Sequence, residues 1–428
     1  MKSKIVLFAA LTFAFSSIAF AQDDWPIWRG PNKNGVAPSD QTPPTEWSMD
    51  KNVEWKTKVP GRGHASPILV GDKIFLATAD KSEGTQSVVC FERKTGKQLW
   101  ITEVNKGGLV SRIHHNNTHA SQTIVTKDKK MFVVFNNNGG VQLASLDFDG
   151  KILWEKTVGE FKPKFPFGFG SSPCLYKDTV IVLSDYPQDG FIAAFKQSDG
   201  KEAWRTKRGF TSSYASPIVA KVAGKEQLLV SGSDVRSYDP ATGEENWKCD
   251  GPWQVTCATL VWDGDMVFAS GGFPVKATLG INAKTSKPVW ENRVKCYEQS
   301  MLVTDGHIFA LSDDGIAYCW RAKDGQKQWS QRLKGKVSSS PILAGGNVYM
   351  TNEQGTTFVV KADTEEFKMV QTNKLGDISF ATPSIVNNKI YTRVGVRTDS
   401  KVQEWLFCLS ESKGESAAKE GSDSKPSE

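Results

Sequence analysis

The sequence predicts an all-β protein, an eight-bladed β-propeller of four-stranded antiparallel blades whose ring is closed by an N-terminal strand. Three observations support this prediction: a repeated unit that ends in tryptophan, a repeated opening motif, and one unpaired strand near the start of the chain. Repeats of roughly 40–50 residues with strand-like content are typical of propellers. The 428 residues are 39% hydrophobic, which supports a large core and excludes a globally disordered chain.

The first repeated unit has the form Gly-x-x-x-Trp. The copies TGKQLW, DGKILW, DGKEAW, TGEENW and DGQKQW end at Trp100, Trp154, Trp204, Trp247 and Trp329. TSKPVW has Ser286 in place of the glycine before Trp290, and TEEFKM has Met369 in place of the tryptophan. We expect each tryptophan to occupy the same place in one blade and to pack between neighbouring blades.

The second repeated feature opens each unit with small residues followed by proline or a hydrophobic residue. Eight such openers occur: ASPILV at 65, ASQTIV at 120, SSPCLY at 171, ASPIVA at 215, ATLVWD at 258, QSMLVT at 299, SSPILA at 339 and ATPSIV at 381. A second β-rich run follows, such as KIFLAT (73–78) or HIFALS (307–312), and then a third run before the tryptophan strand. Four short strands joined by glycine turns form one antiparallel blade.

The last unit is one strand short. It ends near Leu409 after three strands, whereas NVEWKT (52–57) reads as a tryptophan strand with no strands before it. Pairing the two closes the ring and removes its free edges. We therefore expect a single propeller domain over residues 52–410.

The segments outside the repeats differ in composition. Lys2 and Lys4, the apolar run 5–18 and the small-x-small site 19–21 predict a signal peptide over 1–21, and hence an exported protein, periplasmic or secreted. The apolar run is too short to predict a stable membrane span. Residues 22–51 are rich in proline and tryptophan and should run extended over the propeller surface, while 411–428 should form a disordered tail.

Seven cysteines in an exported chain leave at least one unpaired. Three share the same hydrophobic strand context and are expected to be small buried packing residues: Cys90, Cys319 and Cys408. Three others are expected in loops between strands, where one disulfide could form and its pairing stays open: Cys249, Cys257 and Cys296.

The [AS]-S-P opener together with the T-G-K-x-x-W unit resembles the tryptophan-docking repeat of the bacterial PQQ-like (pyrroloquinoline-quinone-type) β-propeller repeat proteins, over residues 52–409. The leading WPIWRGP with Gly35 is similar to the N-terminal segment of exported members. The resemblance implies one of two function classes. Quinoprotein dehydrogenases of this fold bind PQQ and calcium on the axis, with an Asp base and often a vicinal disulfide, whereas other members are non-catalytic assembly scaffolds.

Several features of the sequence help to distinguish a quinoprotein dehydrogenase from a non-catalytic scaffold. The chain has no Cys-Cys pair, and its loops offer no clear set of the six to eight oxygens that calcium prefers. It also lacks the lipidated cysteine that the resemblance implies for outer-membrane scaffold lipoproteins. A net charge of +6 falls short of the basic excess of a nucleic-acid binder. We expect a non-catalytic binding or scaffolding protein for a protein, peptide or glycan ligand. The alternative is a PQQ-dependent quinoprotein oxidoreductase of the alcohol or sugar dehydrogenase type, with PQQ and calcium as cofactors.

The expected binding site is the mouth of the ring, where the loops that lead into the innermost strands converge. We align the eight openers on their proline position and take the residue three positions before it in each blade as the one expected at the mouth. These residues are His64, His119, Gly170, Tyr214, Cys257, Glu298, Ser338 and Phe380. A one-residue error would select the other face of the strand. Tyr214 and Glu298 should lie across the axis from the histidines.

Histidine is scarce, yet four of the five cluster in the loops of the first two blades: His64, His114, His115 and His119. Three imidazole nitrogens from HHNNTH (114–119) and His64 would suffice for a catalytic zinc or a copper. The alternative is a polar, hydrogen-bonded rim without metal, because the spacing matches no standard metalloenzyme motif. No catalytic residue is assigned.

Arg62 and Arg112 flank the same region and could bind an anionic group, or could be solvated loop charges. The run FKPKFPFGFG (161–170) is the one loop rich in aromatic residues, and its exposure would favour a sugar or peptide ligand. Packing between blades is the competing interpretation. Trp253 and Tyr297 could extend the same surface.

Overall fold

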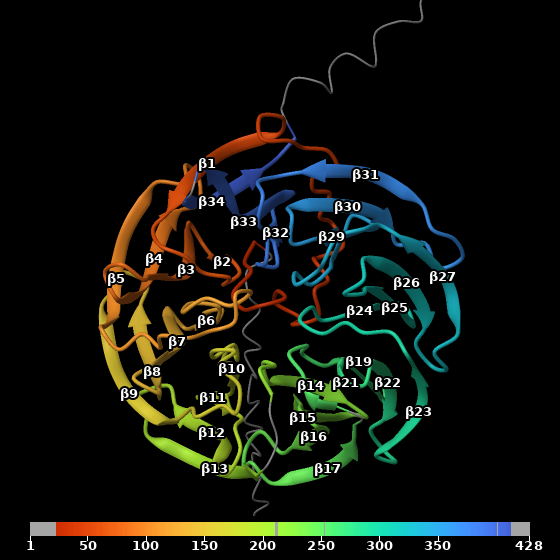
Figure 1. Ribbon diagram of the computed structural model, residues 1–428, viewed down its shortest axis with the longest axis horizontal. Helices are drawn as coiled ribbons and strands as arrows, with labels where there is room; N and C mark the ends of the chain where they lie inside the picture. Colours follow the sequence, from red (N-terminus) through yellow and green to blue (C-terminus); the bar gives the residue numbers. More distant parts are fainter. Residues whose placement is uncertain (1–22, 210–212, 252, 400, 412–428) are drawn as a thin grey trace, which may run out of the picture.

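The computed structural model describes residues 23–209, 213–251, 253–399 and 401–411. Within these ranges the chain forms 34 strands and no helix. The strands build eight four-stranded antiparallel sheets, arranged as blades around a central axis, and one small two-stranded sheet (Figure 1). The predicted eight-bladed propeller is confirmed. The predicted signal peptide and residues 412–428 of the predicted tail lie outside the described residues.

The blades follow one another along the chain, each running from the axis outward (Figure 1). Blade 1 consists of β2 (Ile68–Val70), β3 (Lys73–Asp80), β4 (Thr85–Glu92) and β5 (Gln98–Lys106), and blade 2 of β6 (Val125–Lys127), β7 (Lys130–Asn137), β8 (Gly140–Asp147) and β9 (Ile152–Glu160). Blade 3 consists of β10 (Cys174–Tyr176), β11 (Thr179–Ser184), β12 (Gly190–Lys196) and β13 (Glu202–Gly209), and blade 4 of β14 (Ile218–Val222), β15 (Lys225–Ser231), β16 (Asp234–Tyr238) and β17 (Glu245–Asp250).

Blades 5 to 8 repeat the pattern. Blade 5 consists of β19 (Val261–Asp263), β20 (Met266–Gly271), β22 (Ala277–Asn282) and β23 (Lys287–Asn292), and blade 6 of β24 (Leu302–Thr304), β25 (His307–Leu311), β26 (Ile316–Arg321) and β27 (Lys327–Arg332). Blade 7 consists of β28 (Ile342–Ala344), β29 (Asn347–Thr351), β30 (Thr356–Lys361) and β31 (Met369–Lys374), and blade 8 of β32 (Ser384–Val386), β33 (Lys389–Thr398), β34 (Lys401–Leu409) and β1 (Val53–Val59). The two-stranded sheet pairs β18 (Trp253–Val255) with β21 (Phe273–Pro274).

The ring closes through β1, as predicted. β1 pairs antiparallel with β34 from Val53 opposite Leu409 to Val59 opposite Glu404. A buried charge network also joins blade 8 to blade 1. Arg393 donates to Glu404 and to the carbonyl of Ala77 at 2.7 Å, and Glu404 accepts a second hydrogen bond from Arg62 at 2.7 Å.

The docking of tryptophans between blades explains the repeated unit. Six indole Nε1–H groups donate to a backbone carbonyl of the following blade at 2.8–3.2 Å, those of Trp55, Trp100, Trp154, Trp204, Trp290 and Trp329. Five of these rings cover a glycine with positive φ, where an added Cβ would lie 2.3–2.8 Å from its nearest neighbour: Gly96, Gly150, Gly200, Gly243 and Gly325. The glycine therefore allows both the backbone turn and the close approach of the ring.

The two irregular copies of the unit have structural consequences. Ser286 stands at the glycine position with φ of 59°, and Trp247 donates instead to Gln227 Oε1 of its own blade at 2.7 Å. Met369, in place of the tryptophan, is 41% exposed. In this region Trp47, from the N-terminal segment, packs into the core formed by blades 7 and 8 and stacks on Tyr349.

A small residue usually lies beside the docking tryptophan in the third strand. Cys90, Cys319 and Cys408 pair with Trp100, Trp329 and Trp55, and all three cysteines are fully buried, as predicted. Gly280 takes this position beside Trp290, where an added Cβ would lie 2.3 Å from the ring. The all-round burial of these strands leaves no room for a longer side chain.

The N-terminal segment, residues 23–51, crosses one face of the ring. Trp25 exchanges two backbone hydrogen bonds with Leu69 of β2, and the Arg29 guanidinium donates to the carbonyl of Met301, next to β24. Ala37 donates to the carbonyl of Leu343 in β28. The segment thus ties innermost strands on opposite sides of the axis together.

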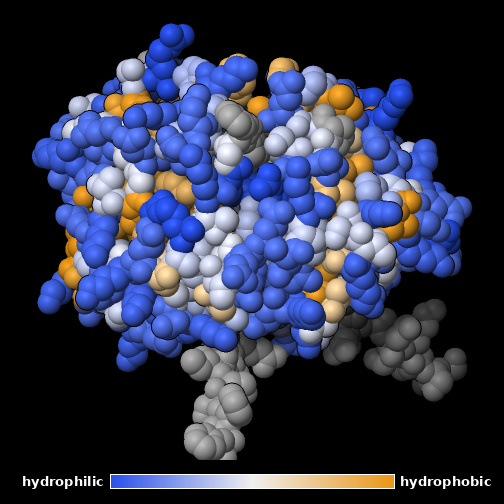
Figure 2. Space-filling model, turned by 90° about the horizontal axis from the view of Figure 1, so that it is seen from below, coloured by the Kyte–Doolittle hydropathy of each residue, from blue (hydrophilic) through white to orange (hydrophobic). Residues whose placement is uncertain are grey.

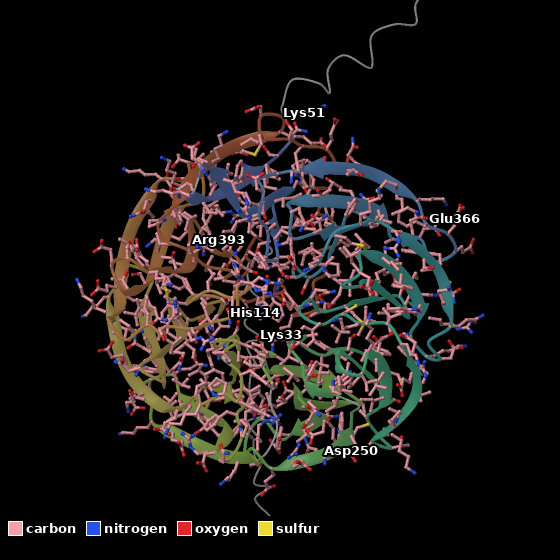
Figure 3. The ribbon with its side chains drawn as sticks, in the orientation of Figure 1. Lys33, Lys51, His114, Asp250, Glu366 and Arg393 are labelled. Atoms are coloured by element: carbon pink, nitrogen blue, oxygen red, sulfur yellow. The ribbon has the colours of Figure 1, made fainter. Side chains whose placement is uncertain are left out.

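The outer rim is polar. Figure 2 views the ring from this side and shows mostly hydrophilic residues, with apolar ones scattered in small groups. Figure 3 places Lys51, Asp250 and Glu366 at the rim, and His114 and Lys33 near the axis. In the described part of the chain, no helix has the length and apolarity needed to span a membrane.

Candidate functional site

A cavity of about 220 Å³ lies at the mouth of the ring. Seven blades contribute to its wall the residue three positions before the proline position of the opener, and blade 2 contributes Ser121 instead of His119. The other seven are His64, Gly170, Tyr214, Cys257, Glu298, Ser338 and Phe380. Trp28, from the N-terminal segment, also lines it. We call this space the mouth cavity. The opener repeat thus positions one side chain per blade around the axis.

A ring of serine and threonine residues lies below these positions and holds the innermost strands in register. Backbone N–H groups donate to the hydroxyl of the next blade at 2.9–3.2 Å, in the order Ser66, Thr123, Ser172, Ser216, Thr259, Ser300, Ser340 and Thr382. These hydroxyls face the axis, where an apolar residue would leave seven buried N–H groups without partners. This requirement explains the small polar residue in every opener.

The hydroxyl ring corrects the sequence alignment in blade 2. Thr123, not Ser121, takes the ring position, so β6 begins two residues later than the alignment assumed. Ser121 therefore lines the mouth cavity in place of His119. His119 is half-buried behind the wall, where its carbonyl accepts a hydrogen bond from Gln86 at 2.8 Å.

Only two of the four clustered histidines line the mouth cavity. His64 stacks on Phe380 with ring centroids 4.3 Å apart, and burial lowers the pKa of His64 to about 3, so its imidazole is neutral. His114 lies against His115 at 4.2 Å, and its Nδ1 accepts the backbone N–H of Asn116. His115 is exposed. Among the described residues, no group of three or more His, Cys, Asp or Glu is placed to hold a metal ion.

Neither predicted arginine lines the cavity. Arg62 pairs with Glu404 in the network that joins blades 8 and 1. Arg112 is exposed on the loop that also carries His114. An anionic ligand in the mouth cavity would therefore meet neither guanidinium, and no lysine or arginine is among the described residues of the wall.

Tyr214 and Glu298 lie in the wall, as expected, and Glu298 belongs to a polar cluster that sequence reasoning missed. Ser338 Oγ lies 2.6 Å from Glu298 Oε2 and 2.9 Å from Glu353 Oε1. Asn116 Nδ2 approaches the same Glu353 oxygen at 3.5 Å. Burial raises the pKa of Glu298, and the neighbouring carboxylates of Glu353 and Asp313 add to the effect.

The aromatic loop forms a second recess beside the first. Phe165 and Phe167 stack at 5.3 Å and line a groove of about 220 Å³ with Phe273, which is 50% exposed. We call it the aromatic groove. Phe167 and Tyr297 line both the groove and the mouth cavity. The remaining aromatic residues of the prediction pack inward, since Phe169 and Trp253 are buried.

The seven cysteines are all free, so the structure contains none of the disulfides considered for Cys249, Cys257 and Cys296. Cys249 lies in β17 rather than in a loop. Cys257 lines the mouth cavity, and burial raises the pKa of its thiol. The thiol therefore stays protonated and weakly nucleophilic at neutral pH.

The wall residues do not fit PQQ with calcium. PQQ is a tricarboxylate, yet the described residues of the wall offer one carboxylate, two imidazoles of which that of His64 is neutral, and no lysine or arginine. Calcium prefers six to eight oxygen ligands. The carboxylates near the cavity are held by a hydroxyl and an amide in a cluster of only four side chains: Glu298, Glu353, Ser338 and Asn116.

Comparison with known proteins places the chain in a family. The family model described as outer membrane protein assembly factor BamB matches residues 44–106, 84–331 and 276–373. Outer membrane protein assembly factor BamB of Burkholderia pseudomallei is 24% identical over 376 residues, which cover 82% of this chain and 87% of that protein.

Two solved structures are similar at lower identity. BamB from Moraxella catarrhalis superposes with a TM-score of 0.57 at 14% identity, covering 84% of this chain and 97% of that one. A europium-containing methanol dehydrogenase superposes with a TM-score of 0.67 at 12% identity, covering 91% and 98%. The two structures show the fold alone. Because the family model matches well over half of the residues, the chain belongs to the family described as outer membrane protein assembly factor BamB, whose members are PQQ-like β-propeller repeat proteins.

Proposed function

We propose that this protein is an exported, non-catalytic binding propeller that holds an extended segment of another polypeptide at the mouth of its ring. The observation that carries the proposal is the junction of the two recesses. The mouth cavity and the aromatic groove share Phe167 and Tyr297 as a common wall, so they form one continuous surface across the face of the ring.

The chemistry of this surface suits a peptide. Apolar rings dominate the groove, and Phe273 in its wall is 50% exposed. The mouth cavity adds hydrogen-bonding side chains around the axis. Aromatic residues next to a polar recess are typical of surfaces that bind another protein.

The family supports the same proposal. The relatives that match over most of their length are named outer membrane protein assembly factors, and assembly requires contact with other polypeptides. The predicted signal peptide would place the protein in the same compartment as such clients. The alternative is the quinoprotein oxidoreductase, although the described wall residues of the mouth cavity do not fit PQQ with calcium.

The test uses peptides that tile the sequence of an outer-membrane β-barrel, immobilised and probed with the purified protein. Binding should fall several-fold in Phe273→Ser, because the groove loses its most exposed ring. Leu99→Ser is the matched control, since Leu99 is 42% exposed but lies on the outer strand β5.

Three outcomes would contradict the proposal. The first is equal peptide binding by wild type, Phe273→Ser and Leu99→Ser. The second is dye-linked oxidation of an alcohol or sugar after addition of PQQ and calcium, which would establish the oxidoreductase instead. The third is binding of oligosaccharides but of no peptide, which would replace the polypeptide ligand by a glycan.

A further inference from the structure

A pair of carboxylates without a cationic partner lies at the mouth cavity, Glu298 in its wall and Glu353 beside it. One hydroxyl hydrogen, on Ser338, must serve both Glu298 Oε2 and Glu353 Oε1, and the Asn116 amide is 3.5 Å from the latter. In the described part of the chain, no lysine, arginine or histidine nitrogen comes within 4.0 Å of either carboxylate. Two neighbouring carboxylates share one site, and such a pair attracts either a proton or a cation.

The surrounding charges do not neutralise this pair. Asp313 adds a third carboxylate nearby, but it is already paired with Lys295 at 3.0 Å. The Lys295 ammonium also lies 5.5 Å from the centre of the Tyr297 ring, on the groove side. The mouth cavity itself therefore has a negative wall.

Aromatic rings cover much of the remaining wall: Trp28, Phe167, Tyr214, Tyr297 and Phe380. The faces of such rings carry negative potential and attract ammonium and guanidinium groups. The neutral His64 adds a ring nitrogen, Nε2, that is buried without a partner and has the capacity to accept a hydrogen bond. Carboxylates and ring faces together favour an organic cation over a bare metal ion.

We propose that the mouth cavity binds the side chain of a lysine or arginine in the bound polypeptide, with its charged group against Glu298 and its methylene chain against the aromatic rings. The proposal rests on the proposed function and deepens it. At about 220 Å³ the cavity is smaller than typical small-molecule sites and suits one long side chain. Its opening beside the aromatic groove lets the rest of the peptide continue there.

The test compares hexapeptides with blocked ends that differ at one position, which is lysine, arginine, norleucine or glutamate. Their affinities are measured by calorimetry at pH 7.5. We expect the lysine and arginine peptides to bind at least tenfold more tightly than the norleucine peptide. Glu298→Gln should remove this preference, whereas Glu291→Gln, the same change on the exposed face of β23, should retain it.

A pH series provides the second readout. The raised pKa of Glu298 means that acid protonates it earlier than an ordinary glutamate, and a bound cation favours the ionised form. The affinity of the lysine peptide should therefore fall as the pH is lowered from 7.5 to 5, while that of the norleucine peptide stays level. The ionisable groups that face Glu298 are Glu353, Asp313, Cys257 and Tyr297. Burial raises the pKa of Cys257 and of Tyr297, so both stay protonated over this range and do not contribute to the change.

Glu353→Gln keeps the proposal testable if Glu298→Gln fails to fold, and thermal melting identifies folded variants. Equal binding of the lysine and norleucine peptides would overturn the proposal and leave the proposed function intact. Displacement of the lysine peptide by millimolar calcium acting through Glu298 would overturn it as well, because the cavity would then be a metal site. If none of the peptides binds, the proposed function also fails.

Discussion

The substitution Gly243→Ala tests whether tryptophan docking, rather than turn geometry alone, requires the glycines of the repeat. Gly243 has φ of 75°, and an added Cβ would lie 2.3 Å from Cε3 of the docked Trp204. Gly264 is the matched control, because its φ is also positive, at 55°, but nothing lies within 4 Å of the Cβ position.

The structure gives different magnitudes for the two variants. A non-glycine residue with left-handed backbone costs about 1–2 kcal/mol, which both should show. Gly243→Ala adds an overlap worth about 1–3 kcal/mol. Displacement of the ring would also break the hydrogen bond from Trp204 to the carbonyl of Pro240, which contributes about 1 kcal/mol. We expect losses of about 3–6 kcal/mol for Gly243→Ala and about 1–2 kcal/mol for Gly264→Ala.

The assay is unfolding in urea, monitored by tryptophan fluorescence. Free energies of unfolding are compared between variants whose slopes of free energy against urea concentration are the same. Ser286→Gly supplies a test of opposite sign. Ser286 already carries the left-handed backbone at this position, so glycine should raise stability by about 1 kcal/mol. Equal losses in Gly243→Ala and Gly264→Ala would refute the reasoning, because the ring contact would then add nothing.

Three further predictions concern stability and the mouth cavity. Asp185→Asn should lower the free energy of unfolding, measured in urea, by about 3–5 kcal/mol, because Arg208 stays buried without its ion-pair partner. Adding Arg208→Met to this variant should recover most of the lost stability. A chain that begins at residue 58 loses most of β1 and should melt at a much lower temperature by calorimetry, and an unchanged midpoint would disprove closure by β1. Trp28→Ala should weaken peptide binding several-fold in calorimetry with little change in melting temperature, whereas Trp25→Ala, at a buried position, should cost about 3–5 kcal/mol.

The fold was predictable because each blade repeats the same packing requirements. A docking ring needs a glycine beneath it, and an innermost strand needs a small hydroxyl residue in the ring around the axis, so both leave a period in the sequence. The missing fourth strand of the last unit then required β1 as its partner. Ser286 and Met369 stood out as departures from this period, and the structure shows different packing at both.

The site was predictable only where the same period extends to it. Seven of the eight aligned positions line the mouth cavity, and the alignment failed in blade 2, where the residue of the hydroxyl ring is Thr123 rather than Ser121. The triplet Thr123-Ile124-Val125 matches Thr259-Leu260-Val261 of blade 5 and would have given the correct register.

Other functional residues lie outside the repeat and left no periodic signal. Asn116 comes from the long loop before β6, and Glu353 from the turn between β29 and β30. Glu353 meets Ser338 within blade 7, and Asn116 reaches Glu353 from the loop that leads into blade 2. Trp28 also lies outside the repeat, and it reaches the axis only because the N-terminal segment crosses the ring.

The N-terminal segment separates two cavities along the axis, and the charged residues in their walls differ. Trp28, Ser172 and Ser216 line both the mouth cavity and a larger cavity of about 570 Å³ farther along the same innermost strands. The described walls of this second cavity carry more cations than anions: the lysines Lys33, Lys127, Lys129 and Lys177 and the aspartates Asp24 and Asp128. The indole of Trp28 therefore separates a carboxylate-bearing space from a lysine-bearing one. Since charges of opposite sign act over about 8 Å at physiological ionic strength, a polypeptide reaching the ring should meet a preference for basic residues at the mouth and for acidic residues behind Trp28.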